Sequence, residues 1–240
     1  MIRRLLRRSA LGKKALAGWG RRRIAAAHGE AKIHLGCGEQ ILDGYLNVDF
    51  PPSAHTLQRT SRADFYADVR TLDFPDGSFA EVRSHHVFEH FDRPTALALL
   101  VRWQRWLRPG GCIWIETPDF DGSARAVLDA SLPFADKAVS LRHLFGSHEA
   151  SWAYHLEGWN DERFRHTLQG LGYADVAIEH GTYKSIYNVT AKAGRGSVPS
   201  PAAQRARVEE LLRESLVDDS STELTLLRVW MRVFDELSPP

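Results

Sequence analysis

Two short runs of the sequence carry residue types that suit binding of a ligand with hydroxyl groups. Gly36-Cys37-Gly38 follows an apolar run that ends at Leu35, and a Gly-x-Gly turn lets backbone approach a ligand closely. Asp49 ends the next apolar run, where a carboxylate can accept hydrogen bonds from both hydroxyls of a ribose. Each feature alone is also typical of an ordinary strand exit, so the inference depends on their combination.

Histidines supply the second kind of chemistry, because imidazole can act as a general base near neutral pH. The candidates for substrate contact and catalysis are His155, then His148 and His86. Each of them could instead cap or pack. His85, His86 and His90 stand near Glu89, but their spacing crosses a strand exit rather than following one helix face, so we predict no metal site. Glu89 and His90 fit better as helix-start and hydrogen-bonding residues.

Strand and helix patterns alternate through the middle of the chain. Strands are expected over 32–35, 45–49, 80–84, 112–116, 176–180 and 187–193, and helices over 94–107, 161–171 and 202–237, the last broken near 218–221. Residues 121–147 look helical and are long for a loop, which indicates an inserted cap. Strands separated by helices imply an α/β fold with a doubly wound, mostly parallel sheet. Ligands of such sheets bind at the carboxyl ends of the strands.

Composition and charge narrow the protein class. Of 240 residues, 43% are hydrophobic and 25% are charged, which is ordinary for a globular protein, and the net charge of +1 argues against general nucleic-acid binding. Two cysteines without metal spacing favour a reducing compartment, so we expect a cytoplasmic protein. The expected organisation is a basic helix over 1–30, a ligand-binding domain over 31–194 with its cap at 121–160, and a linker with C-terminal helices over 195–240.

Nine lysine and arginine residues precede the first acidic residue, Glu30. This segment lacks the apolar core of a signal peptide. Three interpretations stay open: a solvated helix face, a helix over 2–24 that lies peripherally on an anionic membrane, or, least favoured, a nucleic-acid contact.

Three segments together resemble one family. They are IHLGCGEQILDGYLNVDF from Ile33, ADVRTLDFPDGSFAEVRSHHVFEHF from Ala67 and WLRPGGCIWIETPD from Trp106. In order and spacing they are similar to the class I S-adenosylmethionine-dependent methyltransferases of the type 11 group. The resemblance implies a Rossmann-like seven-stranded sheet with a terminal antiparallel strand and S-adenosyl-L-methionine as cofactor. It also implies cofactor contacts by Gly36, Cys37, Gly38, Asp49, Asp68, Val69 and His85, with Asp68 near the adenine amine and Val69 against the ring.

The sequence departs from the broad family at the first helix, because only about ten residues separate Gly38 from Asp49. This short spacing, with Asn47-Val48-Asp49, resembles predicted methyltransferases of surface-glycan biosynthesis. We therefore expect methyl transfer to a small-molecule or glycan acceptor, at oxygen. The alternative is a non-catalytic protein of the same fold that docks through its terminal helices. A nicotinamide enzyme is disfavoured, because the third glycine is missing and the spacing to Asp49 is short. The sequence does not define the oligomeric state.

Overall fold

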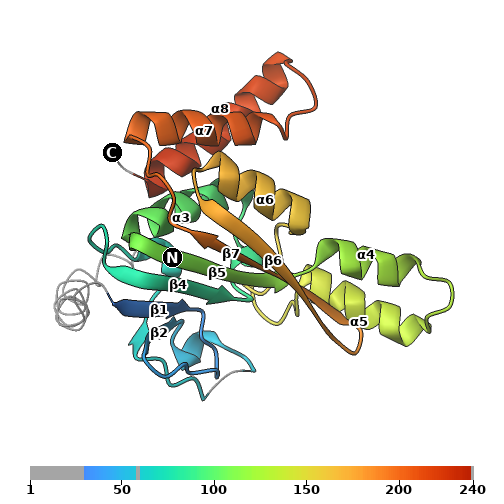
Figure 1. Cartoon of the computed structure of the whole chain (residues 1–240). Helices are drawn as coiled ribbons and strands as arrows, with labels where there is room; N and C mark the ends of the chain where they lie inside the picture. The colour runs from blue at the N-terminus through green and yellow to red at the C-terminus, as the bar shows by residue number, and fades with distance from the viewer. Residues whose placement is uncertain (1–29, 58–59, 239–240) are drawn as a thin grey trace.

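A seven-stranded sheet organises the molecule, with strand order β3-β2-β1-β4-β5-β7-β6 (Figure 1). The computed structural model describes residues 30–57 and 60–238, so the basic helix expected over 1–30 lies outside the described residues. The strands are β1 (Ala31–Leu35), β2 (Tyr45–Asp49), β3 (Phe65–Tyr66), β4 (Phe79–His85), β5 (Leu107–Pro118), β6 (Ala174–Tyr183) and β7 (Ile186–Gly194).

Strands β3, β2, β1, β4 and β5 pair in parallel, whereas β7 is antiparallel to both β5 and β6. This arrangement confirms the predicted Rossmann-like, mostly parallel seven-stranded sheet. The sequence pattern did not predict β3, because two residues are too few to show a period. The carboxyl ends of the parallel strands meet at one edge of the sheet, which we call the crest.

Four helices pack together beside the sheet: α3 (Arg93–Trp106), α6 (Asp161–Gly170), α7 (Pro201–Arg213) and α8 (Ser221–Leu237). Figure 1 shows α7 and α8 lying against α3 and α6. Asp92 starts α3 by accepting a hydrogen bond from Thr95 N–H at 3.0 Å, with Pro94 in the first turn. Ser200 and Ser220 cap α7 and α8 in the same way.

One hydrophobic core joins these helices to the sheet. Ile33, Val82 and Ile113 come from adjacent strands and are buried in one cluster with Trp103 and Trp106 of α3. The same cluster includes Val208, Leu212, Leu227, Met231 and Phe234 of α7 and α8. The C-terminal helices therefore share the main core. Trp114 on β5 is half-buried, and the cations of Arg83 and Lys192 each lie 3.8 Å from its ring centre.

The connections at the crest differ in length and form. Residues 36–44 form turns without a helix, which agrees with the short spacing noted above. Short 3-10 turns η2 (Pro52–Ala54), η3 (Val69–Thr71) and η4 (Phe88–His90) follow β2, β3 and β4. After β5, α4 (Phe120–Leu128) and α5 (Phe134–Phe145) project from the sheet as a helical pair within the expected cap (Figure 1). The crest is therefore bordered by short turns on one side and by this pair on the other.

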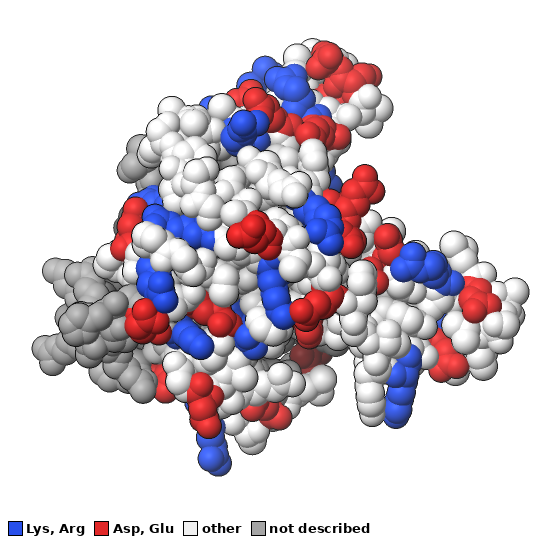
Figure 2. Space-filling view, in the orientation of Figure 1, with Lys and Arg blue, Asp and Glu red and all other residues white. Residues whose placement is uncertain are grey.

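Charged side chains of both signs intermingle over the face seen in Figure 2. Among the described residues, no helix combines the length and apolar character needed to cross a bilayer.

Candidate functional site

The glycine turn and Asp49 form one hydrogen-bonded unit at the crest. Gly38 N–H donates to Asp49 Oδ2 at 2.5 Å, and Phe50 N–H donates to Asp49 Oδ1 at 2.6 Å. Gly36 N–H and Cys37 N–H both donate to the Val48 carbonyl. The turn therefore uses its N–H groups within the protein, so no helix N-terminus here faces an anion. The Asp49 side chain is fixed, and about two of its four lone-pair positions stay available for hydroxyl donors.

A buried imidazole lies beside Asp49. His55 Nε2 is 3.5 Å from Asp49 Oδ1, yet neither ring nitrogen of His55 makes a well-formed hydrogen bond within the described part of the chain. Trp152 packs edge-on against the His55 ring at 5.1 Å and donates from Nε1 to the Ala54 carbonyl at 2.9 Å. The loop after α5 therefore reaches across the crest to the turn after β2.

The other residues expected to contact the cofactor have partners of their own. Asp68 caps η3 and forms an ion pair with Arg70, whose Nη2 is 2.6 Å from Asp68 Oδ2. Val69 is buried in the hydrophobic core, and the His85 ring lies 5.1 Å from that of His34. Burial and the Asp49 charge raise the pKa of Cys37 to about 12, so its thiol stays protonated. Direct contacts of these four residues with a cofactor stay predictions.

A second cluster at the crest is centred on Glu89, whose side chain is 1% exposed. Glu89 Oε1 lies 3.2 Å from His86 Nδ1 and 3.8 Å from His155 Nε2. His86 Nε2 lies 3.3 Å from Glu116 Oε1, so His86 bridges two carboxylates. We call Glu89, His86, His90, His155, Glu116 and His143 the histidine-carboxylate cluster. It joins the ends of β4 and β5 to α5 and the loop after it.

Two histidines of this cluster differ in charge. Burial acts to lower the pKa of His86, but its hydrogen bonds to Glu116 and Glu89 outweigh burial and raise that pKa to about 10. Burial lowers the pKa of His155 to about 4, against the opposing effect of Glu89. Burial acts to raise the pKa of Glu89, but the hydrogen bond to His86 and the charges of the nearby histidines outweigh burial and lower that pKa. The hydrogen bond to His86 also lowers the pKa of Glu116. At neutral pH, His86 is therefore a cation between carboxylates, whereas His155 is a neutral imidazole.

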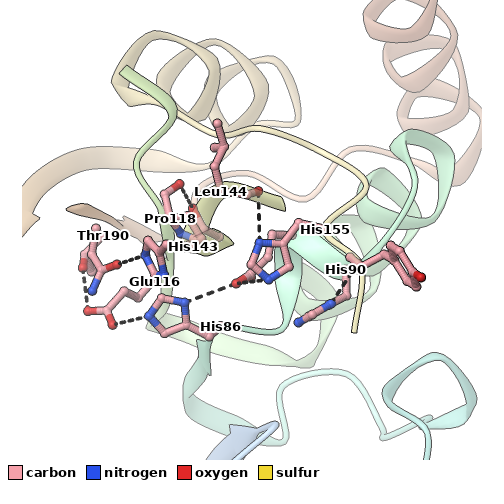
Figure 3. A network of polar contacts seen from close by, with 12 residues as sticks. His86, His90, Glu116, Pro118, His143, Leu144, His155 and Thr190 are labelled. Atoms are coloured by element: carbon pink, nitrogen blue, oxygen red, sulfur yellow. Dashed lines mark hydrogen bonds and ion pairs between the residues drawn. The ribbon is translucent and has the colours of Figure 1, made fainter. Parts of the chain in front are cut away.

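Backbone carbonyls fix the tautomers of the His155 and His90 imidazoles. His155 points toward Leu144 (Figure 3), and its Nδ1 lies 3.2 Å from the Leu144 carbonyl. His90 Nδ1 lies 3.0 Å from the Tyr154 carbonyl. Because a carbonyl only accepts, each Nδ1 carries the proton. Each Nε2 then has a free lone pair. His86 itself has a φ of 50°, an uncommon conformation for a residue with a side chain, and one that recurs at functional sites.

The structure brings together two of the three histidines expected to act on substrate, His86 and His155. The third, His148, has its Nε2 at 3.0 Å from the Phe145 carbonyl and stacks on the exposed Tyr154. No contact among the described residues links His148 to Glu89. Trp159, in the loop before α6, is 2% exposed and packs with Phe88 and Phe164.

Sequence reasoning missed the roles of Glu89 and Glu116. Glu89 was interpreted as a helix-start residue, yet its carboxylate is the centre of the cluster. Glu116 stood at the end of the expected strand 112–116, and the parallel pairing of β4 and β5 places it opposite His85. The rule that parallel strands end at one crest could therefore have indicated Glu116.

The residues at β1 and β2 fit the cofactor implied by the resemblance. Asp49 has the acceptor atoms that a ribose diol requires, and it is 6% exposed, so water screens it weakly. His55 adds unpartnered ring nitrogens next to it. The glycine turn brings backbone, rather than side chains, to the same place. The fold is Rossmann-like, and ligands of such sheets generally bind where the parallel strands end.

Comparison with protein families identifies the class. Residues 29–115 match the model of a methyltransferase domain family. The match confirms the resemblance noted in the sequence. The protein is an S-adenosylmethionine-dependent methyltransferase, with S-adenosyl-L-methionine as its cofactor.

Solved structures give more distant similarities. The chain is similar to a 1,6-didemethyltoxoflavin-N1-methyltransferase from Burkholderia thailandensis, with 12% identity over 82% of this chain and 88% of that chain, and a TM-score of 0.47. It is also similar to human N-acetylserotonin methyltransferase, with 18% identity over 74% and 52% of the two chains and a TM-score of 0.45. A methyltransferase from Methanosarcina mazei shows 12% identity over 71% and 93%, with a TM-score of 0.46. A comparison with curated proteins gives no match.

Proposed function

We propose that this methyltransferase acts on an oxygen of a small-molecule or glycan acceptor, at the crest beside Glu89. The observation that carries the proposal is the state of His155. Its Nδ1–H is held by the Leu144 carbonyl, and its Nε2 faces Glu89 Oε1 at 3.8 Å. A neutral imidazole oriented in this way can accept a proton from a hydroxyl, and the buried carboxylate stabilises the imidazolium that forms.

The Gly36–Gly38 turn and Asp49 hold the cofactor at the ends of β1 and β2 in this proposal, with Asp68 and Val69 toward its adenine. The cofactor supplies a methyl group on a sulfonium, which is already electrophilic. The protein therefore has to align the acceptor, exclude water and remove one proton. Trp152 supports this role, because it contacts the His55 ring at 5.1 Å and the His90 ring at 6.3 Å. It thus lies between the Asp49 side of the crest and the histidine-carboxylate cluster.

Calorimetry with S-adenosylhomocysteine tests cofactor binding, and no heat of binding at millimolar ligand contradicts it. Formation of S-adenosylhomocysteine is then measured with a panel of acceptors bearing hydroxyl, carboxyl or amine groups, including free and nucleotide-linked sugars. Turnover with hydroxyl acceptors alone is the expected result. The proposal fails if only amines or carboxylates are methylated, and absence of turnover with cofactor bound favours the non-catalytic alternative.

The proposed base is tested by His155→Ala. Loss of a general base lowers kcat about 10²- to 10⁴-fold, and S-adenosylhomocysteine affinity is expected to stay unchanged. His166→Ala is the matched control, because His166 is exposed on α6 and pairs with Glu214 at 2.7 Å. An unchanged kcat in His155→Ala removes His155 from the mechanism.

Two further expectations are kept as proposals. Peripheral contact with anionic membrane through residues 2–24 is tested by sedimentation with vesicles of anionic and of neutral lipid. Binding to neither kind of vesicle contradicts it. A cytoplasmic location is tested by fractionation of cells that express the full chain.

A further inference from the structure

The atoms around Glu89 are arranged as a set of metal ligands. One ligand atom each from Glu89, His90 and His155 lies within 4.8 Å of the other two. Two imidazole nitrogens and one carboxylate oxygen are a common donor set for divalent ions of the first transition series. Sequence spacing had argued against a metal, but that argument lacked His155, which comes from the loop after α5.

The lone pairs of both imidazoles are available for an ion. Because each Nδ1–H is held by a backbone carbonyl, Nε2 is the free atom of His155 and of His90. Metal-binding histidines in proteins show this same pattern: the ring nitrogen that does not bind the metal donates a hydrogen bond, and that bond fixes the orientation of the ring. The two rings lie 4.6 Å apart, almost perpendicular at 82°.

Glu89 provides an independent observation. Its carboxylate is buried, and Oε2 has no hydrogen-bond partner among the described residues. An unpaired buried carboxylate oxygen is costly, so it favours a cation. His86 cannot balance the charge alone, because its single ring lies between Glu89 and Glu116 and offsets at most one of them.

We infer that Glu89, His90 and His155 form a binding site for one divalent transition-metal ion of the Zn²⁺ or Co²⁺ type. Tetrahedral ligands about 2.0–2.1 Å from Zn²⁺ are about 3.3 Å apart, so the three atoms, now within 4.8 Å of one another, draw together by up to about 1.5 Å on binding. His90 and His155 are only partly buried, which leaves a coordination position open to an incoming ligand. His86 holds Glu89 Oε1 and acts as a positioning residue.

Ion binding is independent of the proposed function, whereas a catalytic role for the ion rests on it. An acceptor hydroxyl at the open position would lose its proton to solvent more readily, because a bound cation lowers the pKa of a coordinated oxygen. That oxygen would attack the methyl carbon, and the carbon–sulfur bond would break with its electron pair kept on sulfur. In the metal-loaded protein His155 would be a ligand rather than the base.

The test uses the full chain, stripped with a chelator and free of cofactor and acceptor. Zn²⁺ affinity is measured by competition with a chromophoric chelator, and Co²⁺ geometry by visible absorption. We expect one tight equivalent of Zn²⁺, a tetrahedral Co²⁺ spectrum, and no comparable binding of Mg²⁺. Glu89→Gln and His155→Ala should weaken Zn²⁺ binding at least about 100-fold.

His90→Ala is the second variant, because His90 is less buried than Glu89 and its loss is better tolerated by the fold. Circular dichroism checks folding, and His166→Ala is the surface-histidine control. Equal Zn²⁺ affinity in wild type and folded His90→Ala would overturn the inference, as would equal weakening by His166→Ala. Calorimetry with S-adenosylhomocysteine on the stripped protein separates the two proposals: Zn²⁺ binding without cofactor binding contradicts only the proposed function.

Discussion

The carboxylate of Asp49 accepts a hydrogen bond from Gly38 N–H at 2.5 Å, which joins the ends of β1 and β2 directly. Replacing Asp49 by Asn keeps the size of the side chain and removes its charge. S-adenosylhomocysteine affinity should fall by about 1–3 kcal/mol, because charge-assisted hydrogen bonds to the ribose are lost. Calorimetry measures this change. Asp43→Asn, at an exposed position in the turn before β2, should bind like wild type. Equal affinities in all three proteins would place Asp49 outside the site.

Two features of the structure require glycine at position 36: a positive φ angle and the close approach of the Val87 side chain. The φ of Gly36 is +68°, and an added Cβ would lie 1.8 Å from Val87 Cγ2. Gly44 has a φ of +81° but open space around it, so Gly44→Ala isolates the conformational cost. We expect Gly44→Ala to lower the free energy of unfolding by about 1 kcal/mol and Gly36→Ala by about 2–4 kcal/mol.

Denaturant unfolding measures both effects. Adding Val87→Ala to Gly36→Ala should restore part of the loss, because it removes the nearest clashing atom. If Gly36→Ala and Gly44→Ala lower the free energy of unfolding by similar amounts, the clash with Val87 does not destabilise the protein.

His34 should make stability depend on pH. It is 1% exposed, and burial, with help from His85, lowers its pKa from 6.5 to about 4. Asn47 of β2, and Glu81, Arg83 and His85 of β4, act on it. The unfolded chain therefore binds the proton first as pH falls. Stability is lost between pH 6.5 and about 4, by on the order of 3 kcal/mol.

The experiment compares unfolding of wild type and His34→Gln across this pH range. Carboxylates that titrate in the same range are common to both proteins, so the difference between the curves reports His34. The difference should grow below pH 6.5 and level off near pH 4. Parallel curves would contradict the prediction.

We expect the Trp152 side chain to hold the loop after α5 against the turn after β2. Its Nε1–H donates to the Ala54 carbonyl at 2.9 Å, and its ring meets that of His55. Trp152→Ala should speed hydrogen exchange over residues 50–57 and 148–156 while exchange in β4 and β5 stays slow. Tyr154→Ala is the control, because Tyr154 is exposed and stacks only on His148. If hydrogen exchange is faster in Tyr154→Ala but not in Trp152→Ala, Tyr154 rather than Trp152 holds the two segments together.

The pattern of apolar runs was enough to predict most of the sheet. The strand expected over 45–49 matches β2, and the helix expected over 94–107 matches α3 within one residue at each end. These elements repeat one periodicity over several residues, so local sequence determines them. Strand β3 escaped prediction because it has two residues and exists through pairing with β2.

The sequence by itself determined the order of the segments that resemble the methyltransferase family and the short connection between Gly38 and Asp49. Gly38 lies in the turn after β1 and Asp49 ends the adjacent strand β2, so this short spacing brings them together. Only the tertiary structure decided the surroundings of Glu89. His86 and Glu89 follow β4, Glu116 ends β5, and His155 returns from beyond the helical pair α4 and α5. No sequence period relates these positions, because their contact depends on the path of the cap and on the left-handed backbone at His86.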